Sequence, residues 1–254
     1  MTKEVRRKTR TFLFIAITKF IISSYYSNYI MIYRLSLLFF IVVIVGMVSC
    51  KNNDEVFATP LPTYVNVVNA SGDILNFYLN GTRQNNSSSL YPGNQSFYLV
   101  VPAGTDNFQF KKAGDFNVLF SVPLTLKDSV NTTLYVSGES TSNTFHTVDF
   151  LDTTNIINLP QMRIRFVNAS SDAGALNAFV DSTSYSAVPY QTTSNFTLMG
   201  DGPKEIKIYQ AKSDSLLKDT TIIFQPAHIY TLFSRGLIKG KGAAAFNIGL
   251  AINY

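Results

Sequence analysis

The chain has 254 residues, 46% hydrophobic, 13% aromatic and 15% charged, which is enough for one large domain or two domains of about 100 residues each. Low charge with many Tyr, Phe, Thr, Ser and Asn residues favours β-structure over helical bundles. The net charge of +5 arises in residues 1–49, which contain seven basic residues and one acidic residue. The other 14 basic and 15 acidic residues give residues 50–254 a charge of −1. We therefore expect no nucleic-acid partner.

Residues 1–30 precede a second methionine, Met31. They contain an apolar stretch, residues 12–22, that Lys19 interrupts. We expect translation to begin at Met31, which makes residues 1–30 a mis-called N-terminal extension. The alternative is a genuine first segment, which would give the chain an unusually long leader.

Residues 31–49 have the layout of a secretory signal peptide. A short segment ending in Arg34 is followed by an apolar run over residues 35–48 and by the small residue Ser49. A retained transmembrane helix is the weaker alternative, because the run has about 14 residues where about 20 are needed to span a membrane.

The only cysteine, Cys50, follows this leader directly. The sequence Met-Val-Ser-Cys of residues 47–50 resembles the cleavage site of bacterial lipoproteins, except that Leu is usual where Met47 stands. The resemblance implies that Cys50 is lipidated and becomes the new N-terminus, with enough acyl chains for stable anchoring. Residues 50–61 are predicted to be a polar tether. We therefore expect a location in the cell envelope of a Gram-negative bacterium, at the outer membrane.

A short motif occurs twice in the remaining chain. Residues 68–73 read VNASGD and residues 167–172 read VNASSD, 99 positions later, and each copy lies between two alternating segments. Further matching segments follow at similar offsets, and short alternating segments separated by turn residues are typical of a β-sandwich. The sequence predicts two tandem all-β domains, residues 62–152 and 160–254.

At this point the chain resembles domain-of-unknown-function family 4397. The resemblance depends on the two VNAS motifs, the strand ending in Asn80-Gly81, and residues 98–104, which read YLVVPAG. Asn69 and Asn168 stand where the family usually has His, and the second copy has GDGP at residues 200–203. The resemblance implies a β-sandwich of immunoglobulin or transthyretin-like type, and no activity.

The repeated polar residues Asn69, Asp73, Asn168 and Asp172 allow two interpretations. They could hold Ca²⁺ through oxygen ligands, or their side chains could fasten a strand-to-strand turn. We favour structural turn residues.

Catalytic and metal-binding patterns are weak in this sequence. The only histidines, His146 and His228, fall at non-equivalent places in the two repeats, and Cys50 is the sole cysteine. We expect no metal, no cofactor and no enzyme activity; a hydrolase with a site between the two domains is the least favoured alternative.

Tyrosines on polar faces or in loops are the remaining candidates for ligand contact. Tyr91, Tyr185 and Tyr190 are the leading ones, and Tyr209 is also expected on a polar face. Exposed tyrosines stack on sugars or anchor protein partners, although many in such a fold are only cross-strand surface pairs. We predict an envelope-anchored, non-catalytic binding, adhesion or scaffolding module that contacts a glycan or an envelope protein. The alternative is a carbohydrate-binding accessory of a surface glycan-uptake system.

Overall fold

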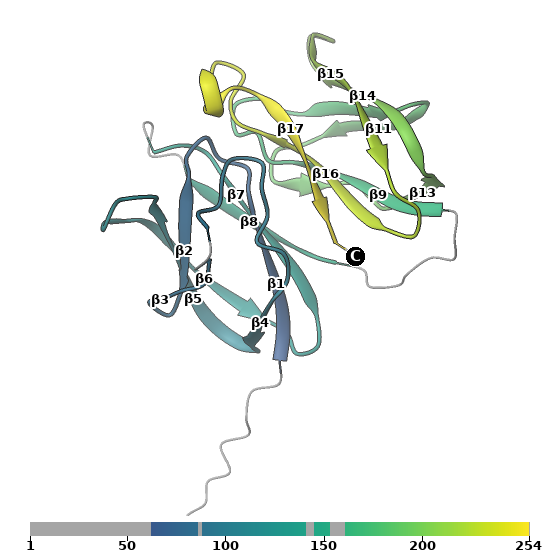
Figure 1. Ribbon diagram of the computed structural model, residues 1–254. Coiled ribbons are helices and arrows are strands. Elements are labelled where there is room, and N and C mark those ends of the chain that lie inside the picture. Colours follow the sequence, from purple (N-terminus) through teal and green to yellow (C-terminus); the bar gives the residue numbers. More distant parts are fainter. Residues whose placement is uncertain (1–61, 86–87, 141–144, 153–160, 254) are drawn as a thin grey trace, which may run out of the picture. The chain divides into compact units, whose positions relative to one another are not determined.

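The computed structural model describes residues 62–85, 88–140, 145–152 and 161–253 (Figure 1). The predicted extension, signal peptide, Cys50 and tether lie outside these residues. The described residues form β-strands and one 3-10 helix, Gly242–Ala244, which confirms the all-β prediction. No helix in this part of the chain is long and apolar enough to cross a membrane.

The first repeat consists of two sheets. Its strands are β1 (Pro62–Asn69), β2 (Leu75–Leu79), β3 (Thr82–Arg83), β4 (Leu99–Pro102), β5 (Gly104–Lys112), β6 (Val118–Leu126), β7 (Asn131–Ser137) and β8 (His146–Leu151). Sheet A has the order β4-β1-β7-β8 and sheet B the order β3-β2-β5-β6.

The second repeat has the same strand order. Its strands are β9 (Gln161–Asn168), β10 (Leu176–Val180), β11 (Thr183–Val188), β12 (Thr192–Thr193), β13 (Thr197–Gly200), β14 (Gly202–Gln210), β15 (Leu216–Phe224), β16 (Ile229–Arg235) and β17 (Asn247–Ile252). Sheet C has the order β12-β9-β16-β17, with β13 also paired to β9, and sheet D has the order β11-β10-β14-β15.

Each repeat contains one parallel strand pair. β1 pairs in parallel with β7, and β9 with β16, whereas the other strand pairs are antiparallel. A parallel pair requires a long crossover connection. In each repeat, the chain between the two parallel strands contains all the strands of the other sheet of the same sandwich. The sequence predicted the strands but not this pairing.

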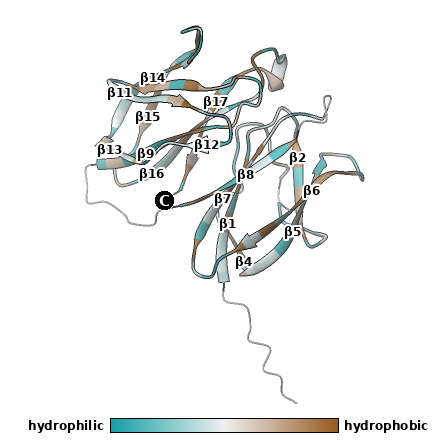
Figure 2. Cartoon of the chain, turned by 180° about the vertical axis from the view of Figure 1, so that it is seen from behind, coloured by the Kyte–Doolittle hydropathy of each residue, from teal (hydrophilic) through white to brown (hydrophobic). Residues whose placement is uncertain are grey.

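Three apolar clusters place the four sheets in the order B, A, C, D. Inward residues of β1 and β2, such as Val65 and Phe77, fill the core of the first sandwich, and those of β9 and β10, such as Ile164 and Ala178, fill the second. A third cluster lies between sheets A and C, where the ring of Tyr135 packs edge-on to that of Phe233 with centroids 5.6 Å apart. Figure 2 lets the reader follow the alternation of hydrophilic and hydrophobic residues along the strands.

The contact between sheets A and C explains why β7 is buried at every position. One face of β7 fills the first sandwich and the other meets the second repeat, so alternating burial gives way to continuous burial. The two repeats accordingly belong to one compact unit.

A buried ion pair also joins the repeats. Arg165 of β9 contacts the carboxylate of Asp152, just after β8, and their side chains are 3% and 0% exposed. Arg165 also donates to the carbonyl of Leu151, at 3.1 Å. Asp152 accepts hydrogen bonds from the hydroxyls of Tyr98 and Thr133, at 2.7 and 2.6 Å. Charges buried this deeply require such partners.

Candidate functional site

The repeated asparagines occupy equivalent buried positions. Asn69 Nδ2 donates to the carbonyls of Asp73 and Leu90, at 2.7 and 2.8 Å. Asn168 Nδ2 donates to the carbonyls of Gly174 and Val188, at 2.7 and 2.9 Å. Each amide therefore connects its own turn to a segment about 20 residues further along the chain.

The two repeated aspartates reach a more distant loop instead of their own turn backbone, which the sequence did not predict. The Asp73 carboxylate accepts hydrogen bonds from the Ser140 N–H and hydroxyl, at 2.9 and 3.1 Å, and lies 2.8 Å from Lys112 Nζ. The Asp172 carboxylate accepts from the N–H groups of Ile238 and Lys239, at 2.8 and 3.3 Å.

The environment of Asp73 shifts its pKa. Partial burial opposes ionisation, but hydrogen bonds from Lys112 and Ser140, together with the Lys112 charge, bring the Asp73 pKa below its ordinary value. The carboxylate is thus held in the charged form by its partners. Within the described residues no group of three His, Cys, Asp or Glu side chains is placed to hold a metal ion.

The three tyrosines predicted as ligand contacts lie in different environments. Tyr91 is 53% exposed in a loop. Tyr185 is only 6% exposed and its hydroxyl donates to the carbonyl of Ile164, so its assignment as a surface contact is wrong. The Tyr190 hydroxyl lies 2.8 Å from Ser137 Oγ, which places Tyr190 between the repeats.

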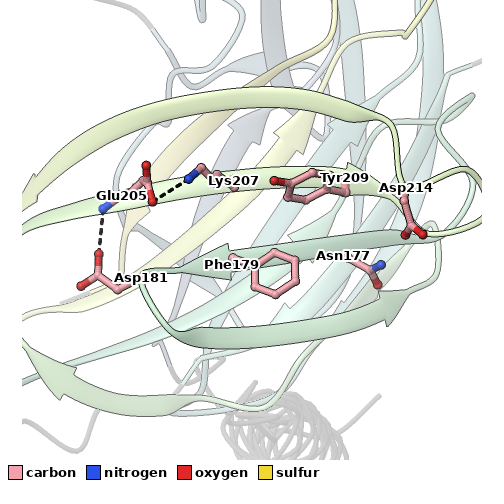
Figure 3. A pocket seen from close by; sticks show the side chains of 7 residues that line it. All are labelled: Asn177, Phe179, Asp181, Glu205, Lys207, Tyr209 and Asp214. Carbon is pink, nitrogen blue, oxygen red and sulfur yellow. Dashed lines mark hydrogen bonds and ion pairs between the residues drawn. The ribbon is translucent and has the colours of Figure 1, made fainter.

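The outer face of sheet D forms a shallow groove of about 370 Å³ (Figure 3). Alternation along β10 and β14 turns Ala178 and Ile208 into the core, so the intervening side chains face outward. The groove is lined by Asn177, Phe179, Asp181, Glu205, Lys207, Tyr209 and Asp214.

Two partly buried aromatic rings form the centre of this groove. Phe179 of β10 and Tyr209 of β14 meet edge-to-face, with centroids 5.7 Å apart and an interplanar angle of 89°. Asn177 is directly opposite Tyr209 in the strand register, and Phe179 is opposite Lys207. Aromatic pairs of this geometry are favourable, and both rings line the groove.

Charged groups surround the aromatic pair. Lys207 Nζ lies 2.8 Å from Glu205, and Asp181 accepts a 2.9 Å hydrogen bond from the Glu205 N–H. That backbone hydrogen bond, and then Lys204 at 3.0 Å, lower the pKa of Asp181. Three carboxylates and one ammonium give the lining a net charge of −2.

The equivalent face of the first repeat is covered by basic side chains. Tyr78 and Phe179 hold the same register position, but the Lys111 ammonium lies 4.7 Å from the Tyr78 ring centroid. Arg83 of β3 donates to Asn76 Oδ1 at 2.8 Å. The first copy therefore lacks the open aromatic pair of the second.

The sequence indicated only part of this groove. Tyr209 lies on a polar face, as expected, whereas Phe179 and the carboxylates were missed. The available signal was the alternation of residues 177–181, Asn-Ala-Phe-Val-Asp, which puts Phe179 in phase with the polar residues.

Comparison with known proteins identifies a family. A family model described as "Domain of unknown function (DUF4397)" matches residues 63–179 and residues 163–245, which confirms the resemblance found in the sequence. No curated protein matches the chain.

Similar solved structures include a family 26 carbohydrate-binding module from Eubacterium rectale Amy13K in complex with maltoheptaose. It is 10% identical, with a TM-score of 0.25, and the match covers 74% of this chain and 96% of that chain. A leucine-rich repeat protein from Bacteroides thetaiotaomicron is 13% identical, with a TM-score of 0.18, over 68% of this chain and 26% of that chain. At these TM-scores neither likeness supports an inference about this chain.

Proposed function

The chain belongs to the DUF4397 family, and we propose that it is a non-catalytic binding module that holds a glycan on the outer face of sheet D. The observation that carries this proposal is the open pair of Phe179 and Tyr209, flanked by carboxylates. Sugar C–H groups pack on aromatic faces, and sugar hydroxyls donate to carboxylates and accept from ammonium groups.

The shape and charge of the groove restrict the ligand further. An open groove along two strands suits a chain of sugar rings lying on the surface better than an enclosed single molecule. The lining has a net charge of −2, which disfavours acidic glycans by like-charge repulsion. We therefore infer a neutral oligosaccharide.

We also propose that this module is tethered to the envelope through lipid on Cys50. The support is the leader and the lipoprotein-like residues 47–50 in the sequence. Replacing Cys50→Ser is expected to release the processed protein from the membrane fraction. Continued membrane association of that variant would refute the anchoring proposal.

A glycan array of neutral and uronic-acid-containing oligosaccharides tests the binding function. The full chain, purified in detergent, is expected to bind one or more neutral oligosaccharides. Tyr209→Ala should weaken that binding by at least about tenfold. Phe116→Ala, which alters a 93% exposed aromatic residue outside the groove, is the matched control and should leave the binding unchanged. Absence of glycan binding, or equal binding by Tyr209→Ala, would contradict the proposal.

A further inference from the structure

A second cavity, of about 280 Å³, lies in the first repeat. It is lined by residues of the segment after β3 and of the segment before β4, which are the edge strands of sheets B and A. Leu90, only 5% exposed, belongs to both the lining and the apolar core. The cavity therefore occupies the open edge of the first sandwich.

The second repeat closes the equivalent edge with a tyrosine. Thr82 pairs with Leu79 of β2, and Thr183 pairs with the equivalent Val180 of β10. Gln84 and Tyr185 each lie two residues further along the chain, so they occupy equivalent positions. The Tyr185 side chain is buried in the second core. Gln84 instead lines the cavity. The two copies thus differ by an open space in one and a filled space in the other.

An exposed and strained aromatic residue stands at this cavity. Phe97 lines it, is 60% exposed, and has a φ of 57°. Ser96 and Ser194 make the same hydrogen bonds in the two repeats, which makes Asn195 the counterpart of Phe97. Asn195 does not have a positive φ, although Asn tolerates that conformation better than Phe. Such strain in a bulky residue points to a functional role.

The chemistry of the lining selects a class of ligand. Besides Phe97 and two leucines, it consists of Gln, Asn and Ser side chains, with no ionisable group among the described residues that form it. Amides and hydroxyls offer both donors and acceptors without charge. The volume is near the lower end of the about 300–1,000 Å³ of small-molecule sites, which suits one sugar ring better than a chain.

Gln95 has a fixed orientation in this lining. Its Oε1 accepts hydrogen bonds from Asn66 Nδ2, at 2.9 Å, and from the Ile252 N–H, at 3.2 Å. These two donors hold the amide in place from the first repeat and from β17. A preorganised polar group of this kind provides orientation at low entropic cost.

We propose that this cavity binds the end unit of a neutral saccharide, with the ring packed on Phe97 and its hydroxyls bonded to Gln84, Gln95 and Ser88. The site is separate from the groove on sheet D, so it goes beyond the function proposed above. With both sites, the second repeat would bind several sugar units along a glycan, and the first repeat would bind the end unit of a glycan.

The test measures binding of neutral disaccharides of glucose, galactose, mannose and N-acetylglucosamine to the full chain by saturation-transfer NMR and calorimetry. Uronic-acid-containing disaccharides are included as probes for an acidic preference. Phe97→Asn introduces the residue of the second repeat at a compatible φ, and Gln84→Tyr introduces the tyrosine that fills the second sandwich. Phe116→Ala, which alters an aromatic residue that is 93% exposed outside the cavity, is the matched control.

We expect one or more neutral disaccharides to bind, and Phe97→Asn and Gln84→Tyr each to weaken that binding by at least about tenfold. Phe97→Asn should melt at the same or a higher temperature, and this variant alone decides the outcome if Gln84→Tyr does not fold. Phe116→Ala should bind as the unaltered chain does.

Three results would overturn the proposal: no disaccharide binds, only the uronic-acid compounds bind, or Phe97→Asn retains full affinity. Loss of disaccharide binding in Tyr209→Ala but not in Phe97→Asn would reject this cavity and support the groove. Loss of disaccharide binding in Phe97→Asn but not in Tyr209→Ala would support the cavity and would show that disaccharides do not bind in the groove.

Discussion

The two repeats share one strand order but differ in what they leave open. The first covers its outer aromatic, Tyr78, with Lys111 and leaves a cavity at its sheet edge beside Gln84. The second fills the edge position with Tyr185 and leaves Phe179 and Tyr209 open on its outer face. In each copy, a buried asparagine connects the equivalent turn to a later segment of the same repeat. A duplicated scaffold can thus keep its internal hydrogen bonds while each copy presents a different surface.

The largest expected difference between the repeats concerns Arg165 and its counterpart in β1, Asn66. Arg165→Ala would leave Asp152 buried without its cation, and we expect a loss of about 3–5 kcal/mol in the free energy of unfolding. Asn66→Ala removes a neutral hydrogen bond to Gln95 and should cost about 1 kcal/mol. Urea denaturation followed by circular dichroism measures both. Equal losses for the two variants would show that the ion pair does not hold the repeats together.

A smaller and equal effect is expected from the repeated turn asparagines. Asn69→Ala and Asn168→Ala each remove one buried and one partly buried hydrogen bond to a carbonyl group, so each should lower the free energy of unfolding by about 2–3 kcal/mol. The same denaturation experiment compares them directly. If one substitution cost much more than the other, the turns would not be equivalent elements of the two copies.

The smallest effect concerns Asp73, which pairs with Lys112 in the first repeat only. Because the Asp73 pKa is lower in the folded chain than its ordinary value, its contribution to stability is present above about pH 4 and is lost as the pH falls through the folded pKa. Lys112 is half exposed, so we expect Asp73→Asn to cost below about 1 kcal/mol at pH 7.

Urea denaturation of Asp73→Asn and the unaltered chain at several pH values between 7 and 3 checks this sign. The difference in stability between the two proteins should shrink as the pH falls below about 4. A difference that grows under acidic conditions would mean that the carboxylate is not stabilised in its charged form.

The alternation of apolar and polar residues and the repeated motif were enough to predict the strands and their duplication. Within each strand, the apolar residues identify the side that faces a core. They could not predict the burial of Arg165, which points away from its own core but is covered by the other repeat. Tyr185 was misplaced for a related reason, since its burial depends on the gap between two sheets. Phe179 was missed because an aromatic residue in a strand is usually assigned to the core.

The most direct test of the account compares the two equivalent outer aromatics. Calorimetric titration of a neutral oligosaccharide that binds the full chain should show at least about tenfold weaker binding for Phe179→Ala and unchanged binding for Tyr78→Ala. Such a result would assign glycan binding to the open face of the second repeat. Equal effects of the two substitutions, or an effect of Tyr78→Ala alone, would contradict the claim that the copies have diverged in this way.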